Sequence, residues 1–137
     1  MIYYNNIDSK YIIKEKRKLT NWIKLCINEE NKTLDTISFN FCTDEYILQL
    51  NNDSLQHDYY TDIITFELND KNKPIEGDIY ISTDRVKDNA KTLNTLFTTE
   101  LHRVLIHGVL HLCGYKDKSK KEELLIREKE NYYLNKL

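Results

Sequence analysis

The chain has 137 residues, of which 40% are hydrophobic and 31% are charged, so it is long enough to fold around one core. Its formal net charge is −2, which excludes nucleic-acid binding through overall positive charge and leaves only local basic patches for that role. We therefore expect one domain over residues 1–137.

The cysteines and the first residues of the chain indicate its compartment. Cys26, Cys42 and Cys113 are odd in number and lack CxxC spacing, which is typical of free thiols in a reducing cytoplasm. The chain begins without the apolar segment of a signal peptide and contains no run of about 20 apolar residues. We expect a soluble cytoplasmic protein with no membrane contact and no disulfide-linked partner.

The first half of the chain predicts two strands and two helices. Aromatic and β-branched residues favour a short strand over residues 2–4, and apolar residues at helical spacing favour a helix over residues 14–30. Alternating polar and apolar residues predict a strand over residues 36–42. Thr43 and Asp44 are suitable caps for a helix that fades after Leu50.

The second half predicts two more strands, over residues 61–66 and 76–82, and three more helices. The N-cap candidates for the first two of these helices are Thr83, Asp84, Thr98 and Thr99. The last helix is expected over residues 120–134. Its expected buried residues are Leu124, Leu125 and Tyr132. Together the elements predict an α+β fold with a small mixed sheet of about four strands and about five helices.

Residues 107–117, which read HGVLHLCGYKD, carry the clearest functional signal. His107 and His111 are four residues apart on a predicted helix, so both imidazoles lie on one face, separated by about 6 Å along the axis. Gly114 can end the helix with a positive φ and let Asp117 approach as a third ligand. Two histidines and a carboxylate suit zinc, and three protein ligands leave a fourth position open, as in catalytic sites. The alternative is a pair of hydrogen-bonded core histidines.

The same spacing of ligands and glycine occurs in the HExxHxxGxxH/D motif of metzincin-type zinc proteases. In those proteases the residue after the first histidine is the glutamate that activates water, and here it is Gly108. The helix is apolar on nearly all sides, so we expect the metal site on a buried central helix. Without the glutamate, the usual proteolytic chemistry is not expected.

Three blocks of this sequence resemble one family. HGVLHLCGYKD is similar to the HGxLHLxGYDH signature of the YbeY family, bacterial zinc-dependent endoribonucleases of rRNA maturation. TDIITF at residues 61–66 and GDIYIS at residues 77–82 are similar to the TDVLSF and GDIxIS strands of that family. The order and spacing of the blocks also agree, and the likeness covers residues 36–130.

The resemblance implies a hydrolase that cuts phosphodiester bonds of single-stranded RNA. Its expected role is processing of the 3′ end of 16S rRNA, with ribosome maturation and quality control. It also implies one Zn²⁺ per chain, bound by His107, His111 and Asp117, which would serve catalysis through the metal. The expected partners are rRNA and ribosomal particles, together with ribosomal or assembly proteins.

The chain departs from the family pattern at three positions. Asp117 stands where the family usually has histidine, and Lys116 replaces the aspartate before it. Leu55 stands where the family has an arginine that is associated with nuclease activity. The substitution at Leu55 removes the expected stabiliser of negative charge on the reacting phosphate.

Other residues are candidates for that role and for binding RNA. Arg103 lies four residues before His107 and shares its helix face, although it is also suited to an ordinary salt bridge. His57, Arg85 and Lys116 are further candidates for stabilising that charge. Lys116 and Lys118 are candidate RNA contacts just beyond the metal motif. The aromatic residues considered for base stacking, or alternatively for the core, are Tyr59, Tyr60 and Tyr115.

Two further functions remain open from the sequence. The first is a ribosome-assembly factor in which zinc mainly holds the fold and catalysis is weak, which Leu55 and the negative net charge favour. The second is a metal hydrolase of another substrate, including peptides, which Gly108 disfavours.

Overall fold

The structure is a computed structural model that describes residues 1–55 and 61–137, apart from the side chains of residues 54 and 55. Within these ranges, four strands form one mixed sheet and five helices surround it, as predicted for the α+β class. In chain order the elements are β1 (Ile2–Asn6), α1 (Lys16–Glu29), β2 (Leu34–Cys42), α2 (Asp44–Leu55), β3 (Ile63–Glu67), β4 (Ile75–Ser82), α3 (Thr83–Thr92), α4 (Phe97–Leu112) and α5 (Lys120–Leu134).

The sheet has the strand order β1-β2-β4-β3, with β1, β2 and β4 parallel and β3 antiparallel to β4. β3 therefore forms one edge of the sheet. Ser82 N–H donates to the Asp62 carbonyl, and Leu68 N–H donates to the Glu76 carbonyl. Residues 62 and 68 are therefore hydrogen-bonded to the β4 side, and by alternation so are the even-numbered residues between them. Because bonded positions alternate in an antiparallel pair, the backbone groups of residues 63, 65 and 67 face the free edge.

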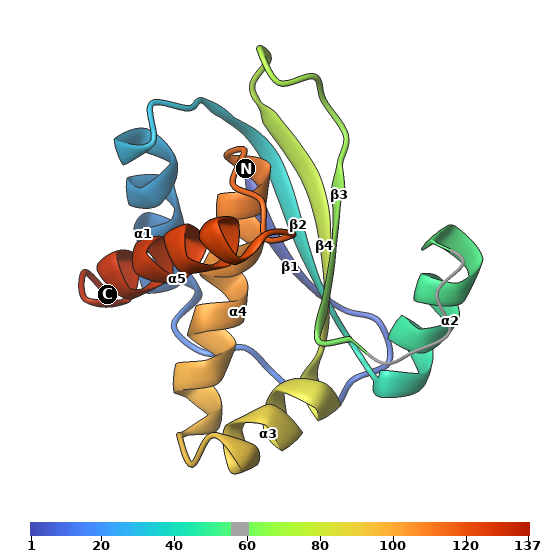
Figure 1. The fold of residues 1–137 in the computed structure, drawn as a ribbon. Coiled ribbons are helices and arrows are strands. Elements are labelled where there is room, and N and C mark those ends of the chain that lie inside the picture. Colours follow the sequence, from blue (N-terminus) through green and yellow to red (C-terminus); the bar gives the residue numbers. More distant parts are fainter. Residues whose placement is uncertain (56–60) are drawn as a thin grey trace.

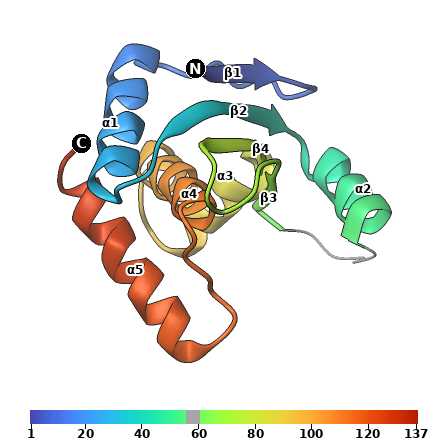
Figure 2. The same cartoon turned by 90° about the horizontal axis from the view of Figure 1, so that it is seen from above.

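The helices form two unequal layers. Figure 1 shows α1, α4 and α5 on one side of the sheet and α2 on the other, and the buried residues divide into a large and a small cluster accordingly. Figure 2 shows α4 between the sheet and α5. α4 is therefore the buried central helix expected from its composition, with nine buried residues in its 16. No helix within the described ranges is long and apolar enough to span a membrane.

Two expectations about helix ends are wrong. The cap of α3 is the Ser82 side chain, which accepts from Arg85 N–H, rather than Thr83 or Asp84. α4 begins at Phe97, and Leu96 at its N-cap makes no side-chain hydrogen bond, so neither Thr98 nor Thr99 caps it. The N-cap therefore lies one or two residues before the expected position at α3 and two or three residues before it at α4. At α3 another residue of the preferred capping type takes the role, whereas at α4 tertiary packing prevails over capping preference.

The expected buried face of α5 is also wrong. Leu124, Leu125 and Tyr132 are between 45% and 59% exposed. The buried residues of α5 are Ile126, Glu130 and Tyr133. The buried row contains a carboxylate, so a search for the most apolar face selects the wrong side of the helix. This carboxylate belongs to Glu130, whose partners Arg103 and His107 lie on α4.

Candidate metal centre and its cavities

The three residues predicted as metal ligands come together at the C-terminal end of α4. His107 and His111 project from the last turns of the helix, and Asp117 returns from the loop beyond it. His111 Nε2 lies 2.9 Å from His107 Nε2 and 3.2 Å from Asp117 Oδ2, and His107 Nε2 lies 3.4 Å from that oxygen. Tetrahedral bonds of about 2.0–2.1 Å to a metal place two ligand atoms about 3.3 Å apart. The triangle therefore has the size of a metal site.

Hydrogen bonds on the other ring nitrogens orient both histidines. His111 Nδ1 donates to the Tyr115 carbonyl at 2.8 Å, and His107 Nδ1 lies 2.6 Å from Glu130 Oε2. With Nδ1 protonated, the Nε2 lone pairs of neutral imidazoles converge with a carboxylate oxygen. Such a set of electron pairs requires a proton or a cation between them, so the residues fit a divalent metal ion.

Charges around His107 favour its protonated form when no metal is present. Burial acts to lower the pKa of His107, but the hydrogen bond and charge of Glu130 and the charge of Asp117 outweigh burial and raise it. Burial acts to raise the pKa of Glu130, but hydrogen bonds from His107 and Arg103 prevail and lower it. The raised pKa of His107 and the lowered pKa of Glu130 both follow from one ion pair, which joins α4 to α5.

The loop that carries Asp117 is held by the turn at Gly114 and by the contacts of Tyr115 with Glu30. Gly114 has φ 110°, which confirms the predicted turn after α4. Next to it, the Tyr115 hydroxyl donates to Glu30 Oε1 at 2.6 Å, and Lys129 Nζ lies 3.2 Å from Glu30 Oε2. Tyr115 thus packs against the core and holds the loop, which agrees with the core alternative rather than base stacking.

Position 108 explains why the protease glutamate is absent. Gly108 lies where α4 approaches the sheet, and a Cβ atom there would meet the Cδ1 atoms of Ile63 and Ile79 at 3.0 Å. Even a methyl group requires these two side chains to shift by a few tenths of an ångström, so any larger side chain is disfavoured at this position. Position 108 therefore serves helix packing and not proton transfer.

The structure describes only part of the remaining predicted site. The Leu55 side chain, His57, Tyr59 and Tyr60 lie outside the described residues. Arg103 Nη1 lies 2.8 Å from Glu130 Oε1, and its Nη2 donates to Asn131 Oδ1 at 2.8 Å. These contacts match the salt-bridge alternative, and they tie Arg103 to the carboxylate that orients His107.

Two cavities meet at the metal motif. One, of about 590 Å³, lies between the free edge of β3 and the loop after α4, and both His107 and His111 line it. Its lysines are Lys71, Lys116 and Lys118. Lys116 and Lys118 were predicted as RNA contacts. Lys71, in the loop before β4, was not, because it is far from the motif in the sequence.

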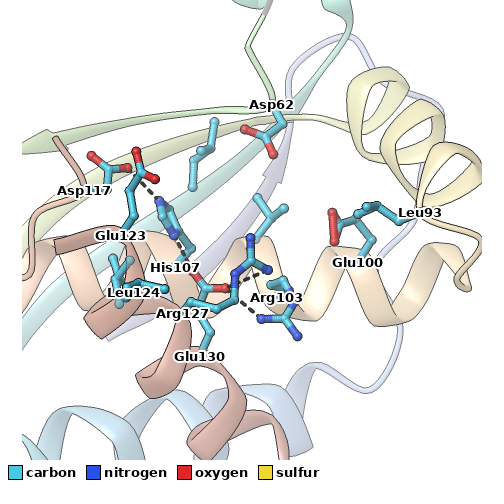
Figure 3. Close-up of a pocket in the computed structure, with 13 residues that line it drawn as sticks. Asp62, Leu93, Glu100, Arg103, His107, Asp117, Glu123, Leu124, Arg127 and Glu130 are labelled. Atoms are coloured by element: carbon cyan, nitrogen blue, oxygen red, sulfur yellow. Dashed lines mark hydrogen bonds and ion pairs between the residues drawn. The ribbon is translucent and has the colours of Figure 1, made fainter. Parts of the chain in front are cut away.

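The second cavity, of about 450 Å³, lies along α4 between the start of β3 and α5 (Figure 3). It reaches His107 and Asp117 and is lined by further carboxyl groups, among them Asp62, Glu100 and Glu130. These three residues were not predicted as site residues. The one available signal was that Glu100 is the single carboxylate of α4.

Comparisons with known proteins agree with the motifs. Residues 3–137 match the family model described as Endoribonuclease YbeY. The chain is 46% identical over 134 residues to Endoribonuclease YbeY of Cytophaga hutchinsonii, covering 98% of this chain and 94% of the relative. It is 49% identical over 123 residues to Endoribonuclease YbeY of Christiangramia forsetii, covering 90% and 85%.

A solved structure is also similar. The solution structure of TM1509 from Thermotoga maritima superposes with a TM-score of 0.66 at 28% identity, covering 98% of this chain and 87% of that chain.

Proposed function

The chain belongs to the YbeY family of endoribonucleases, and from this premise we propose that it is a zinc-dependent endoribonuclease of single-stranded RNA. The observation that carries the proposal is the His107, His111 and Asp117 triangle, which opens onto a cavity lined by lysines. We further propose that its substrate is rRNA, with processing of the 3′ end of 16S rRNA as its role in ribosome maturation and quality control.

In this proposal, His107, His111 and Asp117 bind one zinc ion. The chemistry that zinc supplies at such a site is Lewis acidity, which polarises a phosphate oxygen and makes a bound water more acidic. Glu130 and the Tyr115 carbonyl keep both imidazoles in the tautomer that presents Nε2. The residues around the triangle therefore fix its geometry before substrate arrives.

Binding of the RNA strand is assigned to the cavity beside β3. Lys71, Lys116 and Lys118 supply positive charge for phosphates. The outward backbone groups of residues 65 and 67, together with Ile63 N–H, offer donors and acceptors to unpaired bases, whereas the Ile63 carbonyl already accepts from the Thr61 hydroxyl at 3.3 Å. A cavity of about 590 Å³ has the size of a small-ligand site and is large enough for a nucleotide unit, and unpaired nucleotides are the form of RNA whose bases can enter such a site. These features support a single-stranded substrate.

Metal analysis and RNA cleavage test the proposal together. The purified chain is expected to contain one zinc per molecule and to cut single-stranded rRNA fragments in preference to duplexes. A chelator should abolish cleavage and added zinc should restore it. The double variant His107→Ala, His111→Ala should lose both zinc and cleavage. His102→Ala, on the same helix but outside the triangle, is the matched control and should keep both.

The other outcomes have definite meanings. Cleavage that persists in the double variant comes from a contaminant and contradicts the proposal. Zinc binding without cleavage, together with retained binding to ribosomal particles, indicates the assembly-factor alternative. Metal-dependent cleavage of peptides instead of RNA indicates a hydrolase of another class.

A further inference from the structure

Glu100 is a buried carboxylate that the proposed chemistry does not use. It lies in the first turn of α4 and is only 7% exposed. Its side chain makes no hydrogen bond and no ion pair with any residue in the described ranges, and its oxygens face the cavity that Glu100 lines rather than being fully enclosed. Buried polar groups in proteins nearly always have partners. A carboxylate kept in this state is costly for folding, so its presence points to a partner that comes from outside the chain.

The Glu100 side chain faces the cavity of about 450 Å³ that reaches the metal motif. Figure 3 shows it at the end of the cavity away from Asp117, with Asp62 on another wall. The only side-chain hydrogen bond that Asp62 accepts from the described residues is a long one, 3.4 Å from Asn89 Nδ2. Burial is the main cause that raises the pKa of both Glu100 and Asp62. Two poorly solvated carboxyl groups thus share one cavity.

The charges of this cavity disfavour a second phosphate group away from the metal ligands. Five carboxyl groups line it and only two guanidinium groups do. The carboxyl groups belong to Asp62, Glu100, Asp117, Glu123 and Glu130. Both arginines are already engaged by Glu130, since Arg103 lies 2.8 Å and Arg127 3.6 Å from its Oε1. A second phosphate would therefore be repelled.

The volume and the apolar walls of the cavity suit a neutral ring. Ile63, Val104 and Leu124 contribute apolar surface from three different elements. The volume lies in the range of pockets that hold small organic groups. Glu100 precedes His107 by seven residues, or about 10 Å along the helix axis, which is comparable to the length of one nucleotide. A phosphate at the metal ligands and a base beside Glu100 can therefore belong to the same nucleotide unit.

We propose that this cavity is a nucleobase subsite, in which the Glu100 carboxyl group accepts a hydrogen bond from the exocyclic amino group of a base next to the scissile phosphate. A glutamate that accepts from cytosine N4 is a common form of base recognition, and uracil has an oxygen at that position instead. Glu100 is thus a specificity residue that selects cytosine over uracil. The inference rests on the proposed function, because it assumes an RNA strand at the metal motif.

Equilibrium binding of uncleavable RNA tests the subsite separately from catalysis. The zinc-loaded protein is titrated with short RNA oligonucleotides whose phosphodiesters are replaced by non-hydrolysable methylenephosphonates and that carry cytosine or uracil at one central position, and binding is followed by fluorescence anisotropy. The wild type should bind the cytosine oligonucleotide about 5- to 150-fold more tightly, the range for one good base contact. Glu100→Leu should abolish the preference. Glu100→Gln, whose amide can also donate to uracil O4, should reduce it.

The controls separate failure of the subsite from failure of the function. Glu128→Gln, an exposed position on α5, should leave the preference unchanged. If Glu100→Leu does not fold, Glu100→Gln provides the test with nearly unchanged side-chain volume. Equal binding of the two oligonucleotides by a wild type that cleaves RNA overturns the subsite and leaves the ribonuclease proposal intact. A wild type that neither binds nor cleaves RNA overturns both.

Discussion

Glu130 connects the metal ligands to the rest of the molecule through a single carboxylate. Its side chain is 4% exposed; one oxygen lies 2.6 Å from His107 Nδ1 and the other lies 2.8 Å from Arg103 Nη1. The contact with Nδ1 fixes the tautomer of His107 and increases the basicity of Nε2. The buried carboxylate of α5 is therefore explained by its contact with α4, and not by the stability of α5 itself.

Removal of this carboxylate should weaken metal binding without touching a ligand. Glu130→Ala is expected to lower zinc affinity about 10- to 100-fold, the usual effect of losing such a partner. Glu130→Gln should recover part of the affinity, because its amide oxygen can still accept from Nδ1. Competition with a chromophoric chelator at pH 7 measures both values.

The control for this prediction is Glu128→Ala, which removes an exposed carboxylate from the same helix. Its zinc affinity should equal that of the wild type. Equal affinities for Glu130→Ala and Glu128→Ala would show that Glu130 has no influence on the ligand it contacts.

At the scale of elements, local patterns predicted those parts of the site that lie close together in the sequence. The pair His107 and His111, the turn at Gly114 and the return of Asp117 all depend on helix geometry within 11 residues. Glu130 comes from another helix, 23 residues beyond His107. No periodicity within α5 indicates that one of its glutamates faces inward, because only packing against α4 provides the partners.

The same distinction applies to the fold. β2 and β4 were predictable because their composition and alternation are local properties. The strand order β1-β2-β4-β3 was not, since it depends on which strands pair across long connections. The start of α4 was misplaced for a similar reason. Its first turn is set by packing near Phe97, which contacts the ring of Tyr11 at 5.2 Å between centroids, and not by a capping side chain.

α5 begins with a capping box immediately after the metal loop. The Ser119 hydroxyl accepts from Glu122 N–H at 3.1 Å, and the Glu122 side chain accepts from Ser119 N–H at 2.9 Å. This reciprocal pair satisfies two backbone donors at the start of the helix. It also defines where the loop that carries Asp117 ends.

Loss of the cap should destabilise the whole chain by a moderate amount. Ser119→Ala is expected to reduce the free energy of unfolding by about 1 kcal/mol, within the usual range for caps. Urea denaturation of the zinc-loaded protein measures the change as a lower midpoint at unchanged slope. Lys121→Ala, an exposed change in the same turn, should have little effect. If Ser119→Ala and Lys121→Ala unfold at the same urea concentration, the Ser119 cap does not contribute to the free energy of unfolding.

At the scale of the whole molecule, folding must accommodate the charged groups around the two cavities. Glu100 is surrounded by Asp62 from the segment before β3, Arg103 from its own helix, and Arg127 and Glu130 from α5. Burial is the largest influence on Glu100, and together with the charge of Asp62 it outweighs the arginines and raises the pKa of Glu100. The folded chain therefore holds a proton on Glu100 over a pH range in which the unfolded chain has lost it.

This shift gives Glu100 a definite effect on stability as pH changes. The contribution that favours folding is fully present below the unfolded pKa of about 4.3. It is lost as pH rises through the raised folded pKa, because the ionised side chain is then buried without a partner. At pH 7 to 8, Glu100→Gln should consequently unfold at a higher temperature than the wild type, and the difference should diminish toward pH 4.

Thermal unfolding of wild type and variant at a series of pH values measures this difference. Protonation of the metal ligands affects both proteins alike, so it cancels when the two melting temperatures are subtracted. Glu128→Gln should show no such pH-dependent difference, because that carboxylate is exposed. A Glu100→Gln variant less stable than the wild type at pH 8 would mean that the carboxylate has a favourable partner within the folded chain. The expected result is that Glu100 lowers the stability of the free protein, which is consistent with a group retained to bind a ligand.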